Sequence, residues 1–564
     1  MRLLLISTAI LAILSTPLVS AHDGNHHQIN HHGHHDKRGG NHDAHVKFRM
    51  SDCYGFQLEE ATLDEMQHAL ASRKLTSVQL TKCYIRRIKQ LNPHLHSVIE
   101  LNPDWEEIAA KLDHERRHGH VRGPLHGIPI LVKDNIATKD KMNTGAGSLA
   151  LVGSKPPRDA YIVTLLRKAG AIILGKSNMS EWADIRASSY SEGWSGRGGQ
   201  TRNAYNTTQD PGGSSSGSAV SVAANMIAVA IGTETDGSVV APAQRNGVVG
   251  IKPTLGLTSR AGVIPLAAAQ DTVGCIGRTM RDAVHVLNVI RGVDPRDPVT
   301  REQIHRAKPD YTKYLRKDAF RGKRLGIPWG DIWQSPTTKN QIPQLKKAIR
   351  LMQDLGATVV NNTNLPHPEK INLGKGWTWM PNEFLVCKTG FKEGLNKYLK
   401  ELKNSRVHSL SDIIKYNEEH ADTEMPYFGQ DVLIEADKTT GTHTKEYKEA
   451  LRTNRKYTRE EGIDYVLKKH RLDALIVPAD NLSPSTQVPA LAGYPMVTVP
   501  AGIDPWGVPF GIAFWGTAYS EPTLISLGYA LEQRLQGRRK PRFLEVENTN
   551  ATYPIPINPA YGCC

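Results

Sequence analysis

Stretches with the pattern of buried strands alternate with helical stretches, and this alternation limits the fold more than any other feature of the chain. Residues 161–178, YIVTLLRKAGAIILGKSN, have the pattern of a helix followed by an apolar strand, and residues 218–238, SAVSVAANMIAVAIGTETDGS, repeat it. The strand pattern also occurs in HGIPILVKDNI (126–136) and returns in LDALIVPAD (472–480) and YPMVTVPAG (494–502). This order predicts an α/β fold with a central mixed, mostly parallel sheet surrounded by helices.

The length of 564 residues favours two to four domains on general grounds. Similar apolar strand patterns occur near both ends of the chain. They instead favour one large domain, which we place at residues 47–545. A polar, helical insertion on the substrate side is expected at about 300–460, and a C-terminal tail at 546–564.

Two helices are predicted near the start of this domain from their N-terminal signals. Thr62 with Glu65, and Thr76 with Gln79, have the spacing of capping boxes. The pair Asn92-Pro93 is expected to end the second helix.

The N-terminus has the pattern of a cleaved secretory signal at residues 1–21. Arg2 precedes a short apolar run, and Val19 and Ala21 are small residues where a signal peptidase cleaves. The run is short for a membrane span, and no later run reaches about 20 apolar residues. We therefore expect a secreted, extracellular protein without a membrane association after cleavage; the alternative is an uncleaved anchor.

Residues 22–46 are expected to form a disordered, His-rich tail, because they hold nine histidines and no apolar face. Such tracts can bind Zn, Cu or Ni ions. The net charge is +14, but the Lys and Arg residues are scattered and no aromatic-studded basic stripe occurs. A solvated basic surface is therefore favoured over nucleic-acid binding.

Cysteines and Asn-x-Ser/Thr patterns are interpreted in the light of secretion. The six cysteines are Cys53, Cys83, Cys275, Cys387, Cys563 and Cys564. No two have metal-site spacing, and six cysteines allow 15 pairings; a bond from the C-terminal pair to Cys53 or Cys83 would tie the chain ends together. Among five glycosylation patterns, Asn361 and Asn550 are favoured because they lie in polar stretches.

The segment DPGGSSSGSAV (210–220) has four interpretations. A flexible linker is disfavoured because helix-forming Ala and Val follow at once, and a phosphate loop lacks the required Gly-Lys or G-x-G-x-x-G spacing. Residues 213–217 match G-x-S-x-G, but a nucleophile elbow follows a strand, and here a polar stretch ending in Pro precedes. A role in an active site together with GTETDGS (232–238) remains.

Ser238 ends that second stretch and is a candidate nucleophile. The turn before it offers the backbone N–H groups of Thr235, Asp236 and Gly237, which could stabilise an oxyanion. A serine needs a base, and Lys133 lies at the end of an apolar run, where burial would lower its pKa. The alternative is that Lys133 only extends from a strand end to solvent.

Taken together, these segments resemble the amidase signature family over roughly residues 60–535. The block GGSSSGSAVSVAANMIAVAIGTETDGSVVAPAQRNGVVGIKPT (212–254) is similar to the signature region, and HGIPILVKDNI to the lysine segment. GAIILGKSNMSEWA (170–183), QDTVGCIGRTMRDAV (270–284) and LAGYPMVTVPAG followed by GVPFGIAFWG also fit the family pattern.

The resemblance implies a Ser-cisSer-Lys triad, with Ser238 as nucleophile, Ser214 as bridging serine and Lys133 as base. It implies a cis peptide bond between Gly213 and Ser214 and an acyl-enzyme mechanism without a cofactor or a metal in the site. Ser215 and Ser216 are then expected to be hydrogen-bonding supports. Asn178, in a family motif near the site, is expected to be buried and unglycosylated.

Two positions depart from the pattern of many relatives, which have Gly where Asp236 stands and Arg where Val240 stands. A carboxylate beside an oxyanion hole opposes catalysis. We therefore expect the Asp236 side chain to point away from the site.

Our leading hypothesis is a secreted amidase that hydrolyses a small-molecule carboxamide or N-acyl amine. An ammonia-releasing subunit for tRNA-linked amidation is disfavoured by the secretion signal. A non-catalytic surface or metal-binding protein with a degenerate amidase domain is the alternative from another class, and the intact set of three residues argues against it.

Overall fold

The computed structural model of the chain describes residues 48–334, 336–373, 380–479 and 484–543. The predicted signal (1–21), the His-rich tail (22–46) and the C-terminal tail (546–564) lie outside the described residues, as do Asn550, Cys563 and Cys564. No helix in the described ranges is both long and apolar enough to cross a membrane.

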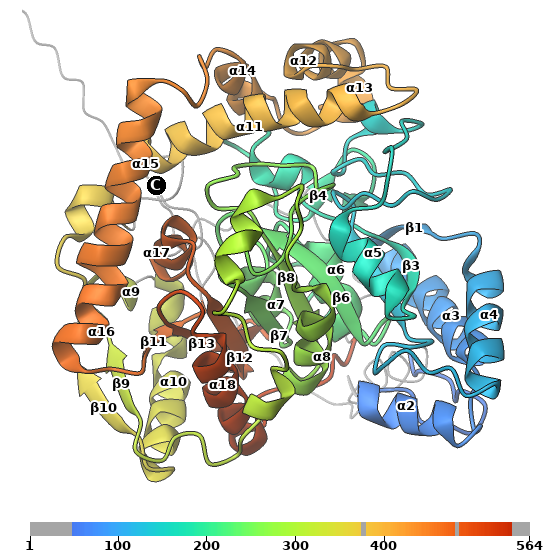
Figure 1. Ribbon diagram of the computed structural model, residues 1–564, viewed down its shortest axis with the longest axis horizontal. Helices are drawn as coiled ribbons and strands as arrows, with labels where there is room; N and C mark the ends of the chain where they lie inside the picture. Colours follow the sequence, from blue (N-terminus) through green and yellow to red (C-terminus); the bar gives the residue numbers. More distant parts are fainter. Residues whose placement is uncertain (1–47, 335, 374–379, 480–483, 544–564) are drawn as a thin grey trace, which may run out of the picture.

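Eleven strands of the described chain form one twisted sheet at the centre of the molecule, surrounded by helices (Figure 1). The strands follow the order β1-β3-β2-β6-β8-β7-β12-β13-β11-β9-β10. Their bounds are β1 Val98–Leu101, β2 Pro129–Lys133, β3 Ile172–Ser177, β6 Val229–Glu234, β7 Val249–Lys252, β8 Thr272–Gly277, β9 Arg324–Ile327, β10 Thr358–Asn361, β11 Ala474–Pro478, β12 Met496–Ile503 and β13 Pro509–Trp515. The predicted class, a mixed sheet with helices around it, is confirmed.

Parallel pairs do not predominate, and the prediction of a mostly parallel sheet is wrong in this respect. Six neighbouring pairs are antiparallel and four are parallel. Strands β12 and β13 are joined by a short connection, which can only produce an antiparallel pair. Helices cover the sheet, so antiparallel strands are also buried and have the continuous apolar pattern on which the prediction rested.

Helices pack around the sheet along the whole described chain. Their bounds are α2 Leu63–Ala71, α3 Ser77–Leu95, α4 Trp105–Arg117, α5 Tyr161–Lys168, α6 Ser216–Ala223, α7 Val240–Arg245, α8 Met280–Ile290, α9 Trp329–Ile332, α10 Pro336–Asp354, α11 Pro381–Glu401, α12 Leu410–Glu419, α13 Ala421–Glu424, α14 Asp431–Asp437, α15 Lys445–Thr458, α16 Asp464–His470, α17 Pro484–Ala492 and α18 Glu521–Leu535. One hydrophobic cluster includes Phe48 and Phe543, so both ends of the described chain pack into the same core.

The first two helices begin where their caps predict. Both threonine capping boxes, at Thr62 and Thr76, are formed. The expected end of α3 at Asn92-Pro93 is wrong, because the helix continues to Leu95 with Pro93 inside it. The chain leaves the helix at His96, whose backbone is left-handed.

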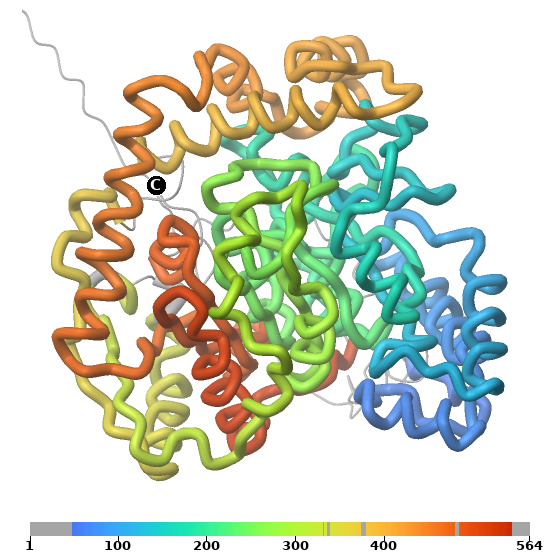
Figure 2. Tube along the Cα trace, in the orientation of Figure 1, coloured from blue at the N-terminus to red at the C-terminus, as the bar shows by residue number. Residues whose placement is uncertain are grey.

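Residues 300–460, expected to be a helical insertion, are divided between the sheet and a separate helical layer. Strands β9 and β10 belong to the edge of the main sheet. Helices α11 to α14 lie together along the upper side of the molecule in the view of Figure 2, and α15 runs from there down the adjacent side. Trp182, Ile264 and Phe391 belong to the hydrophobic cluster that joins α11, α12 and α14 to the rest of the protein.

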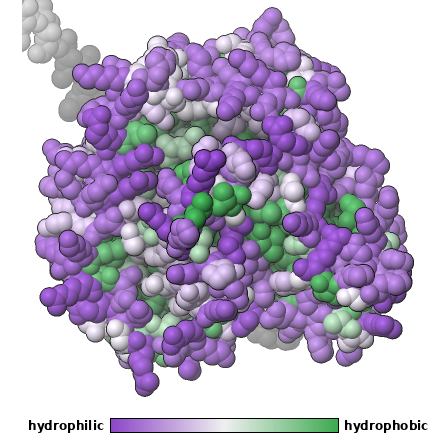
Figure 3. Space-filling view, in the orientation of Figure 1, coloured by the Kyte–Doolittle hydropathy of each residue, from purple (hydrophilic) through white to green (hydrophobic). Residues whose placement is uncertain are grey.

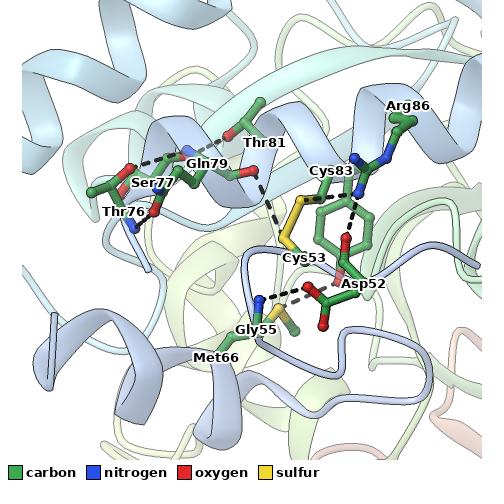
Figure 4. The surroundings of a disulfide bond; sticks show 11 residues. Asp52, Cys53, Gly55, Met66, Thr76, Ser77, Gln79, Thr81, Cys83 and Arg86 are labelled. Atoms are coloured by element: carbon green, nitrogen blue, oxygen red, sulfur yellow. Dashed lines mark hydrogen bonds between the residues drawn. A yellow bond between two sulfur atoms is a disulfide. The ribbon is translucent and has the colours of Figure 1, made fainter. Parts of the chain in front are cut away.

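A disulfide joins Cys53 to Cys83 on α3 (Figure 4). A bond from the C-terminal cysteines to either residue is therefore excluded, because each sulfur already has its partner. Sequence could not select this pair, since the choice depends on which Cβ atoms approach within bonding distance. Cys275 and Cys387 are buried free thiols.

Candidate active site

The three candidate catalytic residues are brought together by two neighbouring strands and one helix. Lys133 ends β2, and Ser238 lies in the turn after β6. These strands pair in parallel, with Leu131 opposite Ala230 and Val132 opposite Ile231. Because the carboxyl ends of parallel strands meet at one edge of a sheet, Lys133 and the Ser238 turn share that edge with the segment that leads into α6.

Lys133 is fully buried and faces the serine-rich segment. Its Nζ atom donates to the Oγ atom of Ser214 at 2.8 Å and to the carbonyl oxygen of Thr233 at 3.1 Å. Burial lowers the pKa of the amine to about 7, because removal from water disfavours its charged form. The alternative, a lysine that extends to solvent, is not observed, since Lys133 has no exposed surface.

Four carboxyl groups near Lys133 oppose this lowering of its pKa: Asp184, Glu192, Glu234 and Asp271. Burial in turn raises the pKa of the Asp184 carboxyl to about 6. Desolvation therefore outweighs the attraction of the carboxylates, and the amine can lose its proton near neutral pH.

The peptide bond between Gly213 and Ser214 is cis, as the resemblance implies. A Cβ atom at position 213 would lie 1.6 Å from Oε2 of Glu192 and 2.5 Å from Oγ of Ser180. Only glycine fits between these two side chains. The Ser180 N–H also donates to the Ser214 carbonyl oxygen at 3.1 Å, which fixes the position of the buried Ser214.

Ser238 faces a pocket and is linked to the serine-rich segment through the backbone. The Ser215 N–H donates to the Ser238 carbonyl oxygen at 3.1 Å. Within the described chain, no hydrogen bond joins the Ser238 hydroxyl to Ser214, so the structure places the three residues in one site without a continuous chain of hydrogen bonds. Catalytic hydrogen bonds are often open in a site without substrate and close when it binds.

The neighbouring serines differ from each other in their contacts. The Ser215 hydroxyl donates to the Thr233 carbonyl oxygen at 3.1 Å and accepts from the Thr233 N–H at 3.3 Å. It is a hydrogen-bonding support, as expected. The Ser216 hydroxyl is buried and has no partner among the described residues, so the same expectation is wrong for Ser216.

The turn at Thr235, Asp236 and Gly237 presents N–H groups that no described residue accepts from. Gly237 has φ +76°, a left-handed backbone that favours glycine. The Thr235 hydroxyl donates to Asp271 at 2.6 Å, which fixes the turn from behind. These donors remain available for an oxyanion beside Ser238.

Glu234 is a functional candidate that the sequence reasoning did not identify. Its Oε2 atom accepts the N–H groups of Val239 at 2.7 Å and Val240 at 3.0 Å, directly after the nucleophile candidate. A carboxylate at the N-terminus of α7 compensates the free N–H groups there. The sequence shows only that a Glu precedes a short helix. The direction of the Glu234 side chain in the structure reveals that it accepts the first N–H groups of that helix.

The pocket beside Ser238 is lined by residues from six segments of the chain. They are Ala183, Asp184, Tyr190, Glu192, Gly213, Thr235, Asp236, Ser238, Leu266, Glu383, Cys387, Thr486 and Gln487. Glu383 and Cys387 come from α11, so this helix borders the pocket. In Figure 3, hydrophilic side chains cover most of the visible face, and hydrophobic ones show mainly in its recesses.

Asp236 does not leave the pocket, contrary to our expectation. Its carboxyl group hydrogen-bonds Thr486, another lining residue, and burial raises its pKa to about 7. The conflict between a carboxylate and an oxyanion is reduced in a different way, because the raised pKa favours the neutral acid.

Asn178 is buried and supports the loop around the site. Its side chain donates to the carbonyl oxygens of His96 at 3.1 Å and Gly199 at 3.0 Å, and accepts from the Ser195 hydroxyl at 2.7 Å. The expectation that Asn178 is buried is confirmed. No group of three metal-binding side chains occurs among the residues that the structure describes.

Comparison with known proteins gives consistent matches over most of the chain. The family model described as Amidase matches residues 79–525. A Schizosaccharomyces pombe protein named as an amidase is 45% identical over 527 residues, covering 89% of this chain and 90% of its own. A glutamyl-tRNA(Gln) amidotransferase subunit from Heliobacterium modesticaldum is 31% identical over 500 residues, covering 85% and 97%. The crystal structure of a peptide amidase from Stenotrophomonas maltophilia superposes with a TM-score of 0.80 at 45% identity, covering 86% of this chain and 99% of the other.

Proposed function

The chain belongs to the amidase family of hydrolases that act on carbon–nitrogen bonds other than peptide bonds, and on this basis we propose that Ser238 is the nucleophile with which it cleaves a carboxamide or an N-acyl amine. The observation that carries the proposal is the buried, 2.8 Å hydrogen bond between Lys133 and Ser214 at the edge of the sheet where Ser238 lies.

In the proposed mechanism, neutral Lys133 takes a proton from Ser214 as Ser214 takes one from Ser238. The Ser238 oxygen then attacks the amide carbonyl carbon, and the N–H groups of the 235–237 turn stabilise the resulting oxyanion. The relay runs backwards to protonate the leaving amine. Water hydrolyses the acyl-enzyme with the same residues acting as base and acid.

The lowered pKa of Lys133 supports its role as the base. A lysine with an ordinary pKa is protonated at neutral pH and cannot accept a proton, whereas an amine with a pKa of about 7 is partly neutral there. The only proton that Lys133 can reach by a direct side-chain hydrogen bond in the described chain is that of Ser214, which makes Ser214 the bridge in the proposal.

Ammonia or amine release from a panel of amides tests this function. The panel spans peptide amides, which the Stenotrophomonas relative suggests, together with aryl amides and fatty acyl amides. We expect turnover by the wild type and its loss in Ser238→Ala and Ser214→Ala. Ser216→Ala is the matched control, because its hydroxyl has no hydrogen-bond partner to lose among the described residues. Full activity in Ser238→Ala would refute the assignment.

A non-catalytic role is the alternative, and a serine-reactive phosphonate distinguishes it from the proposed activity. The reagent is expected to label Ser238 in the wild type and not in Lys133→Met, whatever the natural substrate is. A wild-type protein that stays unlabelled while the Stenotrophomonas enzyme is labelled would favour the non-catalytic interpretation.

Secretion is a further part of the proposal and rests on the N-terminal pattern at residues 1–21. The Cys53–Cys83 disulfide supports it, because such bonds persist in oxidising compartments. Secretion also separates this chain from an ammonia-releasing role in tRNA-linked amidation. N-terminal sequencing of protein recovered from the medium should begin at or near His22; an intact Met1 in protein retained inside the cell would contradict it.

A further inference from the structure

We propose that the pocket binds amides that carry an ammonium group, and that Asp236 and Glu383 bind this positive charge. This inference rests on the proposed function, because it assigns the substrate class of the same pocket. The two acids come from different parts of the fold: Asp236 lies in the turn before Ser238, and Glu383 lies in the first turn of α11.

Each acid has one oxygen with a partner and one without. Oε1 of Glu383 accepts from the Gln270 amide at 2.9 Å, and the Asp236 carboxyl bonds Thr486. Oε2 of Glu383 and Oδ1 of Asp236 are buried and have no hydrogen-bond partner among the described residues. Glu383 is only 1% exposed. Buried polar atoms are normally satisfied, so unpaired acceptors in a pocket point to a donor supplied by a ligand.

The protein does not itself supply a cation for this pair. No Lys, Arg or His residue lines the described pocket, and neither acid forms an ion pair within the described chain. The charge of Lys252 opposes the rise that burial causes in the pKa of the Asp236 carboxyl group. The Nζ atom of Lys252, however, already donates to the carbonyl oxygen of Tyr494. The pocket is therefore locally acidic in a chain whose net charge is +14.

The other two acids of the pocket are explained by Lys133, although Oδ1 of Asp184 is also buried without a hydrogen-bond partner among the described residues. The Glu192 carboxylate accepts from the Ser180 hydroxyl at 2.9 Å, and both Asp184 and Glu192 act on the charge of Lys133. Burial raises the pKa of Asp184, Asp236 and Glu383 alike. Asp184 differs because Lys133 attracts its charge, whereas a charge on Asp236 further raises the cost of ionising Glu383. A bound ammonium would reverse this, since an opposite charge favours the ionised acids.

An ammonium ligand would also reduce the repulsion between the Asp236 carboxylate and an oxyanion bound at the 235–237 turn. An ammonium bound to Asp236 would offset its negative charge next to the N–H groups of Thr235 and Gly237. A substrate with a free carboxylate would instead bring a further negative charge to two acids whose ionisation burial already disfavours, and it would be rejected.

Binding to Ser238→Ala tests the inference without depending on turnover. Calorimetry compares Nα-acetyl-lysinamide, Nα-acetyl-norleucinamide and the α-amide of Nα-acetyl-glutamate, which carry a positive, no or a negative charge on similar side chains. Norleucinamide with a free amine, compared with its acetylated form, tests an ammonium at the α position. We expect at least one ammonium ligand to bind about tenfold tighter than its neutral match, and the glutamate amide to bind weakest.

Glu383→Gln should reduce this preference about tenfold, because it keeps the shape and the bond to Gln270 but removes the charge. Asp236→Asn removes the other carboxylate and should reduce the preference in the same way, which keeps the test valid if Glu383→Gln fails to fold. Glu435→Gln is the matched control: Glu435 lies on the surface and pairs with Lys388 at 2.6 Å, so its loss should leave the preference as it is.

The same ligands, assayed as substrates of the wild type, separate the two proposals. Hydrolysis of neutral and cationic amides at equal kcat/KM, with equal affinities in Ser238→Ala, would overturn the charge preference and leave the amidase function standing. A tenfold binding preference without any hydrolysis would support the ammonium site and count against the proposed function.

Discussion

The Nζ atom of Lys133 lies 2.8 Å from the Oγ atom of Ser214, in an interior position where neither residue reaches solvent. The two residues are 81 positions apart in sequence. Their contact links the end of β2 to the segment that enters α6. In the proposed mechanism, activity therefore depends on whether the buried Lys133 amine is protonated.

Replacing this amine should abolish turnover with little effect on folding. Lys133→Met keeps the length of the side chain and removes the base, so we expect kcat to fall at least about 100-fold. The melting temperature should stay close to that of the wild type or rise, because a buried amine is costly to desolvate. Lys74→Met, at an exposed lysine, is the control; a Lys133→Met enzyme with wild-type kcat would exclude Lys133 as the base.

Activity on a neutral amide should rise with pH as Lys133 loses its proton, with a midpoint near its pKa of about 7. Below the midpoint Lys133 is protonated and cannot act as a base, so the direction is an increase. Asp184 favours the protonated amine, and Asp184→Asn should therefore move the midpoint to lower pH. The pH dependence of kcat/KM checks both statements, and a profile that falls through this range would contradict them.

Gly213→Ala should inactivate the enzyme and destabilise it. The added Cβ would lie 1.6 Å from Oε2 of Glu192, and the buried Ser180 on its other side leaves no room for adjustment. Overpacking of this kind costs about 1–3 kcal/mol. Gly429→Ala is the matched control, since nothing lies within 4 Å of its added Cβ. Activity and denaturant midpoints of both variants give the comparison; equal midpoints would refute the predicted clash.

Glu532 should make folding stability depend on pH. Burial raises the pKa of its carboxyl group to about 7, while the unfolded chain has the ordinary value near 4.5. The folded state then holds the extra proton, so this stability is present below about pH 4.5 and lost as pH rises through 7. Glu532→Gln keeps the acceptor for the Met280 N–H, at 2.7 Å. Between pH 5 and pH 8, the stability of this variant relative to the wild type should increase by about 2.5 kcal/mol. Chemical denaturation at the two pH values measures this, and a difference independent of pH would argue against a buried neutral Glu532.

Removal of the Cys53–Cys83 disulfide should destabilise the protein. The bond closes a loop with a sequence separation of 30 residues, and loop-closure entropy predicts a loss of about 3–4 kcal/mol for the double replacement by Ala. Thermal unfolding of the double variant and of the wild type gives the measurement. Identical melting temperatures would show that the bond does not form in solution or constrains nothing.

Local sequence patterns predicted the elements of this fold well where one short segment decides the outcome. The capping boxes at Thr62 and Thr76 need only contacts three residues apart, and both are formed. The end of α3 was missed at Pro93, because packing of the helix against the core outweighs the local preference of proline. Strand direction was also missed, since burial on both faces produces the same apolar run in parallel and antiparallel strands.

The sequence by itself determined which residues could take part in the chemistry. It identified Ser238, the N–H groups before it and Lys133 from a nucleophile, a turn and a lysine in an apolar run, and the family resemblance added Ser214. Tertiary structure decided what these residues meet: the bond from Lys133 to Ser214, the Glu234 carboxylate at the start of α7, and the placement of Asp236 and Glu383 in one pocket. The reason is physical. A pattern fixes residue type and local conformation, whereas burial, pKa and the partner of a side chain depend on segments that are distant in sequence and meet only when the chain folds.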